Sequence, residues 1–419
     1  MATNRTAINL LYIFPGLLPP PKDPATAEWY HLGGDIDVDI LLPTWMENAQ
    51  SLHTELGDGS FPVHRVSNRL RYHVLLAGKY KFSSFRQKAA IFWFQLKKGL
   101  QIGRTKKIDC IMTYGAGLGG VVAYLLSRIL GAKLIVRLPN VPENAYRYTA
   151  FGGKSFHFSA KAGLKTRVAR RTADVLLRFL VLHCDRVCLM YPYQLQKYPK
   201  LQKVPASVIH SFTAMSRIPH AGNNDGSVLL VGAPWFLKGA DILIRAFRKI
   251  EAEFPDTNVH LLGHFPDEQF LREMIGHSRQ IEILAARPNP EVLQIIANCS
   301  IYALSSRTDA APRVVIEAMA AGKPVVGSRV GGVAHYIREG ETGLLFESEN
   351  ADELAEKLRL LLNSPELRAR LGRNGYRIAR AQYNEAEWGR KLKELIELTV
   401  LGRTTESEEK QNADVCFTS

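Results

Sequence analysis

The chain has 419 residues, about two to three times the length of a typical domain, so a single small module is excluded. With 46% hydrophobic and 22% charged residues it is a globular protein, and a largely disordered or coiled-coil chain is excluded. The net charge is +14, and residues 1–210 carry all of the excess with 29 basic and 12 acidic side chains, a field that attracts phosphates, anionic lipid or nucleic acid.

Apolar strands alternate with helical patterns along most of the chain, which is typical of helices packed on both faces of parallel sheets. The first strand is expected at 8–14, because Pro15-Gly16 interrupts the apolar run and argues against a signal peptide. Further elements of the first half are strands at 38–42, 108–114 and 134–137 and a helix at 121–130 that ends at Gly131. We expect helices and mobile loops over 61–107 and 143–182, which are basic and rich in aromatic residues.

The segment Ser216–Ser227 concentrates Pro, Gly and Asn and is the predicted linker. Beyond it we expect strands at 228–232, 259–263, 281–284, 301–305 and 324–328, and helices at 240–253, around Phe270, and at 291–298, 313–321, 352–362 and 365–381. The predicted organisation is an N-terminal domain over 1–215, a C-terminal domain over 216–384, a helix over 385–401 that crosses back to the first domain, and a disordered tail over 402–419.

Five cysteines at irregular spacing do not form a disulfide framework, and Cys184 and Cys188 miss the CxxC spacing of zinc and redox sites. We therefore expect a cytoplasmic protein with no structural metal. No run of 18 apolar residues occurs, so any membrane contact is expected to be peripheral, at the cytoplasmic membrane face.

Two basic segments of the first half also carry apolar side chains. Residues 85–100 combine Phe92, Trp93 and Phe94 with lysines. Between 161 and 183 one helical face is expected to carry Leu164, Val168, Val175, Leu176, Phe179 and Leu180, with Lys and Arg around them. Such patterns suit attachment to an anionic membrane surface, and equally an ordinary helix with solvated lysines. Nucleic acid is not an expected partner, because no nucleic-acid-binding module accompanies the charge.

The run TYGAGLGG contains Gly115, Gly117 and Gly120 in a GxGxxG pattern between a strand and a helix, the context of a dinucleotide site. The next strand ends in Arg137, which could read a 2′-phosphate, instead of the acidic residue that holds a ribose. Three interpretations of the glycine run therefore remain. It could be the cofactor site of an NADP-dependent oxidoreductase, a tight turn that allows close helix packing, or a loop that lines a substrate site.

Two segments of the second half place charged residues beside helix starts. Gly232 ends a strand, and Lys238-Gly239 precede a helix whose free amides favour a phosphate. Asp309 lies in a loop after a strand, and Glu317 lies eight residues later inside the next helix. Amides at the start of that helix can face a diphosphate, while a carboxylate one turn further can accept two ribose hydroxyls.

The stretch from Val228 to Tyr383 closely resembles glycosyltransferase family 4, whose retaining members have the GT-B fold. The resemblance rests on motifs in the family's order: Gly232, Lys238-Gly239, Glu317-Ala318-Met319-Ala320, Gly322, Pro324-Val325-Val326, Gly331-Gly332 and Thr342-Gly343-Leu344-Leu345. Three positions depart from it, since Asp309 replaces a glutamate, Ala233 an arginine and His335 a glutamate. Arg313 or Arg307 could replace the missing charge, although Arg307 also reads as a solvated surface arginine.

The resemblance implies an α/β protein of two Rossmann-like doubly wound domains that face a cleft. It further implies metal-independent, retaining transfer of a sugar from a nucleotide-sugar, with a UDP- or GDP-sugar favoured over an ADP-sugar, to a hydroxyl of a glycan or lipid-linked acceptor. No further cofactor is expected. An NADP-dependent oxidoreductase and a catalytically inactive nucleotide-sugar-binding homologue remain the alternatives.

The resemblance also implies the site residues. The expected catalytic residues are Lys238, Asp309 and Glu317. The expected donor-binding residues are these three with Gly16, Gly232, Gly239, Ala310, Ala311, Arg313 and Val314. On the acceptor side we expect Gly115, Gly117, Arg137 and Asn140.

Overall fold

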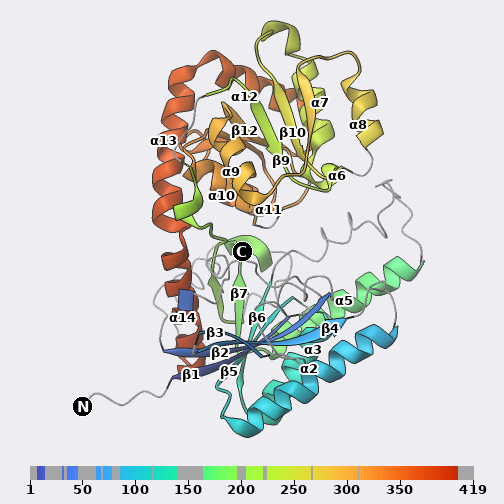
Figure 1. Ribbon diagram of the computed structural model, residues 1–419, viewed down its shortest axis with the longest axis vertical. Coiled ribbons are helices and arrows are strands. Elements are labelled where there is room, and N and C mark those ends of the chain that lie inside the picture. The colour runs from blue at the N-terminus through green and yellow to red at the C-terminus, as the bar shows by residue number, and fades with distance from the viewer. Residues whose placement is uncertain are drawn as a thin grey trace, which may run out of the picture. The chain divides into compact units, whose positions relative to one another are not determined.

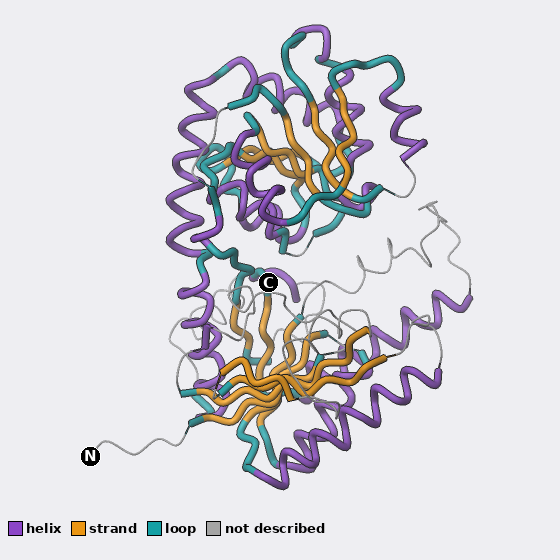
Figure 2. The backbone as a smooth tube through the Cα atoms, in the orientation of Figure 1, coloured by secondary structure: helices purple, strands orange, loops and turns teal. Residues whose placement is uncertain are grey.

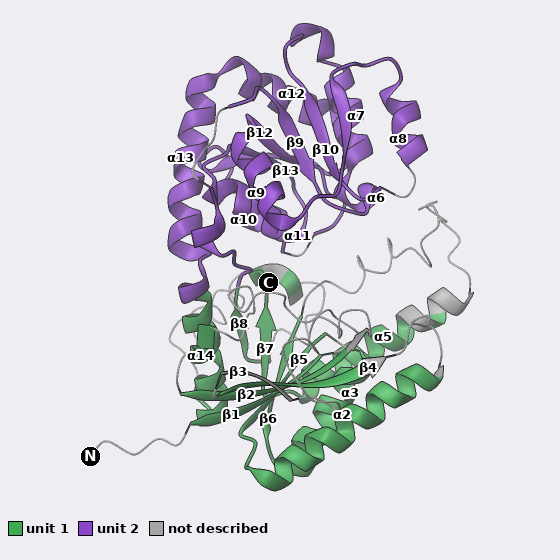
Figure 3. Cartoon of the chain, in the orientation of Figure 1, with its two compact units in different colours: residues 1–139, 162–209, 388–419 green, residues 140–161, 210–387 purple. Residues whose placement is uncertain are grey.

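The computed structural model describes residues 7–14, 31–32, 35–45, 63–67, 69–77, 85–115, 117–138, 164–195, 204–219, 224–265, 268–309 and 311–403. They form two compact units, coloured separately in Figure 3. Unit 1 holds the described residues up to Leu138, those from Leu164 to Ile209 and those from Trp388 onward. Unit 2 holds His210–Glu387, so the division falls at Ile209/His210, ahead of the linker segment Ser216–Ser227. The predicted tail lies outside the described residues from 404 onward.

Unit 1 is built on an eight-stranded sheet of order β3-β4-β2-β1-β5-β6-β7-β8. Its strands are β1 (Ile8–Ile13), β2 (Ile36–Trp45), β3 (Val63–Ser67), β4 (Leu70–Ala77), β5 (Cys110–Tyr114), β6 (Lys133–Arg137), β7 (Arg186–Leu189) and β8 (Ala206–Val208). All neighbouring strands are parallel except β3 and β4, which form an antiparallel pair at one edge. The expected strands of the first half are confirmed, and the parallel sheet is the Rossmann-like architecture predicted for this domain.

The expectation of helices and loops over 61–107 is wrong in its first part, because β3 and β4 lie there. The strand pattern of β4 is hidden by Arg71 and His73, two polar residues that serve one buried carboxylate. Arg71 Nε donates to Asp39 Oδ1 at 2.8 Å, and His73 Nε2 lies 2.8 Å from the same oxygen. Lys106 Nζ lies 2.7 Å from Asp39 Oδ2. These partners hold the pKa of Asp39 well below its usual value, against the opposing effect of burial.

Three helices of unit 1 pack side by side on the sheet (Figure 1). They are α2 (Phe85–Thr105), α3 (Leu118–Leu130) and α5 (Leu164–His183), and α3 contacts both of the others. The α2–α3 contact is close because Gly99 and Gly103 lie against leucines of α3, where an added Cβ would come within 2.4 Å of Leu126 and 2.6 Å of Leu130. As predicted, α3 ends at Gly131, which adopts a left-handed conformation.

The last helix, α14 (Glu385–Leu401), has the bounds predicted from the sequence, and its residues from Trp388 belong to unit 1. Gly389 lies against the backbone of His31, where an added Cβ would come within 2.1 Å of the carbonyl oxygen. Lys393 Nζ donates to Asp35 Oδ2 at 2.5 Å. Among the described residues of both units, no helix is long and apolar enough to cross a membrane.

Unit 2 contains a six-stranded, wholly parallel sheet of order β11-β10-β9-β12-β13-β14, drawn in orange in Figure 2. Its strands are β9 (Val228–Val231), β10 (Val259–Gly263), β11 (Ile281–Ala285), β12 (Ile301–Leu304), β13 (Val325–Ser328) and β14 (Gly343–Phe346). Its helices are α6 (Trp235–Lys238), α7 (Ala240–Arg248), α8 (Glu268–Ile275), α9 (Asn289–Asn298), α10 (Arg313–Ala320), α11 (Gly331–Tyr336), α12 (Ala351–Asn363) and α13 (Pro365–Gln382).

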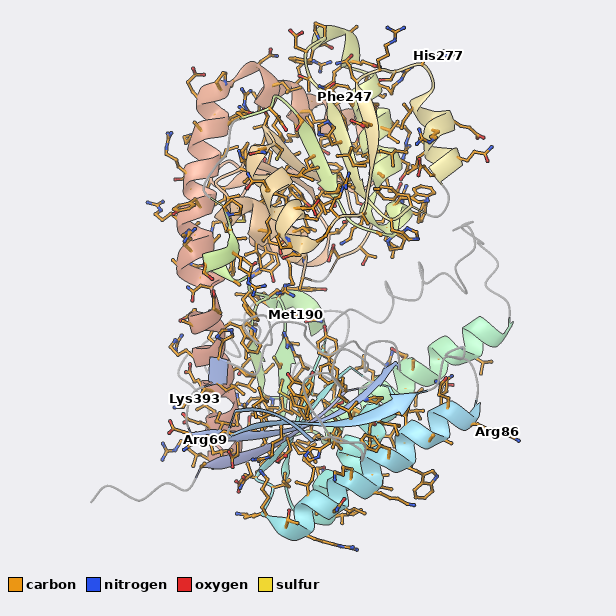
Figure 4. All side chains as sticks on the ribbon, in the orientation of Figure 1. Arg69, Arg86, Met190, Phe247, His277 and Lys393 are labelled. Carbon is orange, nitrogen blue, oxygen red and sulfur yellow. The ribbon has the colours of Figure 1, made fainter. Side chains whose placement is uncertain are left out.

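The helix predicted over 240–253 is shorter than expected. It ends at Arg248, and a separate 3₁₀ turn follows at Glu251–Glu253. Its apolar face is as predicted, since Ile242, Leu243, Ala246 and Phe247 are buried against the sheet; Figure 4 labels Phe247.

The order of strands in unit 2 reverses at β9 and β12. From β9 the chain adds β10 and β11 on one side, and it then returns to lay β12 on the other side. In doubly wound sheets ligands bind outside the carboxyl ends of the strands at such a switch point. The segments Gly232–Gly239 and Ser305–Asp309 follow these two strands directly. The topology therefore brings both predicted donor motifs together at the carboxyl ends of the two central strands β9 and β12.

Candidate functional site

The two loops at the switch point of unit 2 are in direct contact. Ser305 Oγ donates to the Gly239 carbonyl oxygen at 2.6 Å. Gly239 has a φ of +71°, and a Cβ added to it would lie 1.8 Å from the carbonyl oxygen of Ser305. Glycine is therefore required here by both conformation and space. The contact fixes the start of α7 against the end of β12.

Lys238 and Asp309 meet across these loops. Lys238 Nζ donates to Asp309 Oδ2 at 2.5 Å, and the side chains are 20% and 13% exposed. The lysine stem lies over Gly232, whose φ is +141° and whose added Cβ would approach Lys238 Cγ to 2.9 Å. Gly232 and Lys238 were predicted as parts of one donor-binding element. The position of Lys238 depends on Gly232, because a side chain on Gly232 would occupy the space that the lysine stem fills.

The backbone of Asp309 is anchored to the next helix start. The Gly332 amide of α11 donates to the Asp309 carbonyl oxygen at 2.8 Å. Gly332 therefore ties the backbone of the Asp309 loop to the start of α11. Ala310, the next predicted donor residue, lies outside the described residues.

Helix α10 carries the second predicted carboxylate. Arg313 and Val314 form its first turn, with Ala311 just before it, and Glu317 lies one turn further in. Glu317 is buried, and burial raises the pKa of its carboxyl group, while Arg313 acts in the opposite direction. Among the described residues, burial and the charge of Arg313 are the influences on this carboxylate, and no hydrogen bond contributes to its pKa. A buried acceptor of this kind matches a ligand that brings its own donors, such as the hydroxyls of a ribose.

Arg307 is neither a solvated surface residue nor a replacement phosphate ligand, so both sequence-based interpretations are wrong. It is buried, and Nη1 and Nη2 each donate to Asp241 at 2.7 Å. Nε donates to Glu349 at 2.6 Å, and Nη1 donates to the Phe236 carbonyl oxygen at 2.6 Å. Its amide donates to the Leu237 carbonyl oxygen at 2.9 Å. Arg307 therefore ties α6, which carries Lys238, to the loop that carries Asp309.

Only one of the two proposed substitutes for the arginine missing at Ala233 remains. Ala233 is exposed and has no group that could bind phosphate. Arg313 is exposed in the first turn of α10, where its Nε donates to the Phe212 carbonyl oxygen at 3.2 Å. Since Arg307 is fully engaged with carboxylates, Arg313 is the remaining candidate for the second positive charge.

His335, which departs from the resemblance, pairs with another histidine. Its Nε2 lies 3.5 Å from Nε2 of His210, with the two ring centroids 4.6 Å apart. Burial lowers the pKa of His335, and the nearby Arg338 lowers it further. A histidine whose pKa is lowered thus stands at the position where the motif of the resembled family has a glutamate.

The glycine run of unit 1 has a packing role. A Cβ on Gly120 would lie 2.5 Å from Leu180 of α5, and Gly115, with a φ of +80°, donates from its amide to the Arg137 carbonyl oxygen at 2.7 Å. Gly117 is the N-cap of α3. Arg137 is only 1% exposed, with its guanidinium carbon 5.4 Å from the Tyr114 ring centroid.

These features support the tight turn with close helix packing. They do not support a 2′-phosphate site on Arg137, because the side chain is buried. Two further predicted site residues, Gly16 and Asn140, lie outside the described residues.

Sequence reasoning missed the clamp around Arg307. Asp241 and Glu349 lie far from it along the chain, and each reads separately as an ordinary surface carboxylate near a helix start. His210 was missed for the same reason, since only the fold brings it to His335.

Comparison with known proteins gives a family match within unit 2. Residues 213–378 match the family model "Glycosyl transferases group 1", so the chain contains a domain of this class. An uncharacterised glycosyltransferase of Methanocaldococcus jannaschii is 28% identical over 279 residues, which cover 67% of this chain and 72% of that protein.

Two solved structures share the fold across both units. Sucrose-phosphate synthase from Thermosynechococcus elongatus has a TM-score of 0.72 at 16% identity and covers 94% of this chain and 100% of its own. The Anabaena protein HepE, solved with UDP and glucose, has a TM-score of 0.65 at 17% identity and covers 93% of this chain and 99% of its own. The predicted α/β architecture of two Rossmann-like domains, the GT-B fold, is therefore confirmed.

Proposed function

We propose that the protein is a glycosyltransferase that moves a sugar from a nucleotide-sugar to an acceptor hydroxyl, with retention at the anomeric carbon and without a metal. The observation that carries the proposal is the Lys238–Asp309 ion pair at the switch point of unit 2. The buried carboxylate of Glu317 lies in α10, the helix that follows the Asp309 loop. A cation, an acceptor of sugar hydroxyls and an acceptor of ribose hydroxyls thus come from adjacent segments of one domain.

Lys238 and the amides of the first turn of α10 would stabilise the leaving nucleoside diphosphate. Negative charge grows on the leaving group as the glycosidic bond breaks, and preorganised cations and amides act most strongly on charge that develops in the transition state. Arg313 would add a second positive charge from the same turn.

The two carboxylates would divide the recognition of the donor. Glu317 would accept hydrogen bonds from the ribose, since it is buried and its carboxylate needs donors. Asp309 would accept from a hydroxyl of the transferred sugar. Because Asp309 now pairs with Lys238, a donor that engages both residues would exchange one ion pair for two contacts with substrate.

The comparisons support this proposal at the level of the domain and the fold. We propose a UDP- or GDP-sugar as the donor in preference to an ADP-sugar, and HepE, which shares the fold, was solved with UDP and glucose. The acceptor is proposed to be a hydroxyl of a glycan or lipid-linked sugar.

A donor screen tests the proposal without knowledge of the acceptor. Thermal unfolding is measured with UDP, GDP, ADP and their sugars, because a ligand that binds only the folded state raises its stability by about 2.7 kcal/mol at 100 times its Kd. Release of nucleotide from the same sugars is then measured with the wild type, Lys238→Ala and Lys249→Ala. Lys249 is the matched control, since it also pairs with an aspartate, Asp352, but lies at the other end of α7.

We expect a stabilising nucleotide, and release that Lys238→Ala abolishes and Lys249→Ala leaves intact. Binding without turnover in the wild type would instead identify an inactive nucleotide-sugar-binding homologue. Stabilisation by NADP alone would favour the oxidoreductase.

A further inference from the structure

The α2–α3–α5 layer of unit 1 exposes large apolar side chains on its outer face. These residues, which we call the outer face, are each 39% to 65% exposed: Trp93, Ile129, Val168, Val175, Phe179 and Leu182. Single exposed apolar residues need no explanation, but six on three adjacent helices are a concentration, and concentrations of exposed apolar side chains mark interaction sites.

The exposed residues of α5 follow a helical repeat. Val168, Val175, Phe179 and Leu182 are spaced by seven, four and three residues, which places them on one side of the helix. The opposite side packs into the core through Leu177, Leu180 and Val181. The apolar face expected from the sequence is therefore wrong in two members, because Leu180 is buried and Leu176 packs against the core, while Leu182 is exposed. The side chain of Leu164 lies outside the described residues.

Helix α2, like α5, has one side packed against the core and one exposed side that carries an apolar residue. Phe92 and Phe94 pack against the core of unit 1, whereas Trp93 between them is 55% exposed. The side chain of Arg86, at the start of α2, points away from the unit (Figure 4).

The charge of this layer is strongly one-sided. The three helices contain eleven basic residues and one acidic residue, Asp174, which pairs with Arg178 at 2.9 Å. Seven of the basic side chains are exposed: Arg86, Lys88, Lys97, Arg104, Arg128, Arg171 and Arg178. The exposed apolar residues of these three helices thus lie among basic side chains, and the helices themselves supply almost no negative charge.

We propose that unit 1 attaches to anionic membranes through the outer face, with Trp93 and the exposed residues of α5 at the level of the lipid headgroups. An anionic bilayer supplies both complements, negative charge and an apolar layer beneath it. A second copy of the same face would meet like charge, which opposes association. A nucleic acid would complement the charge, but it offers no apolar layer for Val168, Val175 and Leu182.

Vesicle flotation of the full chain tests this surface independently of any transfer activity. Vesicles of phosphatidylcholine alone are compared with vesicles that also contain phosphatidylglycerol, at low and high salt. We expect the protein to float only with the anionic vesicles and to be released by salt, because screening shortens the field.

Two pairs of variants identify the face. Arg171→Ala with Arg178→Ala is compared with Arg373→Ala and Arg377→Ala, which remove the same charge from exposed positions of α13 in unit 2. Leu182→Gln, at a side chain 50% exposed on α5, is compared with Leu360→Gln, at one 49% exposed on α12. We expect the α5 double variant to lower the partition coefficient about 10- to 30-fold and Leu182→Gln about 3- to 10-fold.

Circular dichroism and thermal unfolding confirm that each variant is folded. Equal flotation with neutral and anionic vesicles would overturn the proposal, as would equal losses in the α13 and α5 variants. Concentration-dependent dimerisation that Leu182→Gln abolishes without lipid would assign the face to a second copy instead. Binding to heparin or RNA that depends on Leu182 as strongly as vesicle binding does would assign it to a soluble polyanion.

Discussion

The ammonium group of Lys238 lies 2.5 Å from Oδ2 of Asp309, so the cation proposed for the leaving group and the carboxylate proposed for the sugar neutralise each other. The charge of each residue is compensated by the other until a bound donor breaks the ion pair or forms hydrogen bonds to both residues. Changing one of the two therefore alters the charge that the other presents, and single variants at this pair report on both.

Lys238→Ala is expected to lower kcat more than it raises KM, since leaving-group charge is greatest in the transition state. Steady-state kinetics with the donor identified by the screen will show the ratio, with Lys249→Ala as the control. An increase of KM with kcat intact would leave Lys238 as a ground-state binding residue only.

Glu317→Gln is expected to weaken nucleotide binding about 10- to 150-fold, because the ribose loses a charged acceptor worth about 1.5–3 kcal/mol. The same variant should raise the free energy of unfolding at neutral pH. Burial raises the pKa of Glu317, so its ionised form is disfavoured in the folded state and the neutral amide removes that cost. Calorimetry and denaturant unfolding measure the two effects. Unchanged nucleotide affinity in the folded variant would remove Glu317 from the donor site.

The raised pKa of Glu317 also predicts a pH dependence of binding. Nucleotide affinity should fall as the pH drops through this pKa, which lies above the ordinary value for a glutamate. Titration calorimetry across acidic pH values will show the decline, and Glu317→Gln should be flat over the same range. A parallel decline in that variant would assign the effect to another group.

Gly232→Ala is expected to displace the Lys238 stem, because the added Cβ would lie 2.9 Å from Lys238 Cγ. Turnover should fall while nucleotide affinity, which depends mainly on Glu317, changes little. Gly322→Ala is the matched control, since Gly322 also has a positive φ, +74°, but has no atom within 4 Å of an added Cβ. Equal losses of turnover in both variants would point to backbone strain instead of the displaced lysine.

Asp39→Asn is expected to destabilise unit 1 by about 3 kcal/mol at neutral pH, since it breaks a buried ion cluster and leaves Arg71 and Lys106 with only the more distant carboxylate of Asp37. The depressed pKa of Asp39 contributes stability that is present above the unfolded-state value, near 4, and is lost as the pH falls towards the folded-state value. Denaturant unfolding between pH 7 and pH 3 should therefore show a shallower acid loss in the variant than in the wild type.

The regular alternation of unit 2 was predictable because its strands are short apolar runs and its helices are amphipathic. Strand β10 and helix α14 have the predicted bounds, and the motifs around Lys238 and Asp309 meet as the topology requires. The strand β4 was not predictable, because Arg71 and His73 interrupt its apolar pattern. Their partner Asp39 lies on the neighbouring strand β2, which is 32 residues away from Arg71 along the chain. The same holds for Arg307, whose role depends on two carboxylates that no local pattern connects to it.

The clamp of Arg307 constrains how this chain can change through evolution. One guanidinium group serves Asp241, Glu349 and the Phe236 carbonyl oxygen. Replacing Asp241 leaves the buried Arg307 with only the exposed Glu349, and replacing Arg307 leaves Asp241 with only Arg245. Single substitutions at positions 241, 307 and 349 should therefore be strongly epistatic. Natural sequences that lack the arginine are expected to have exchanged the two carboxylates as well, and the three positions should covary even in relatives that use different sugars.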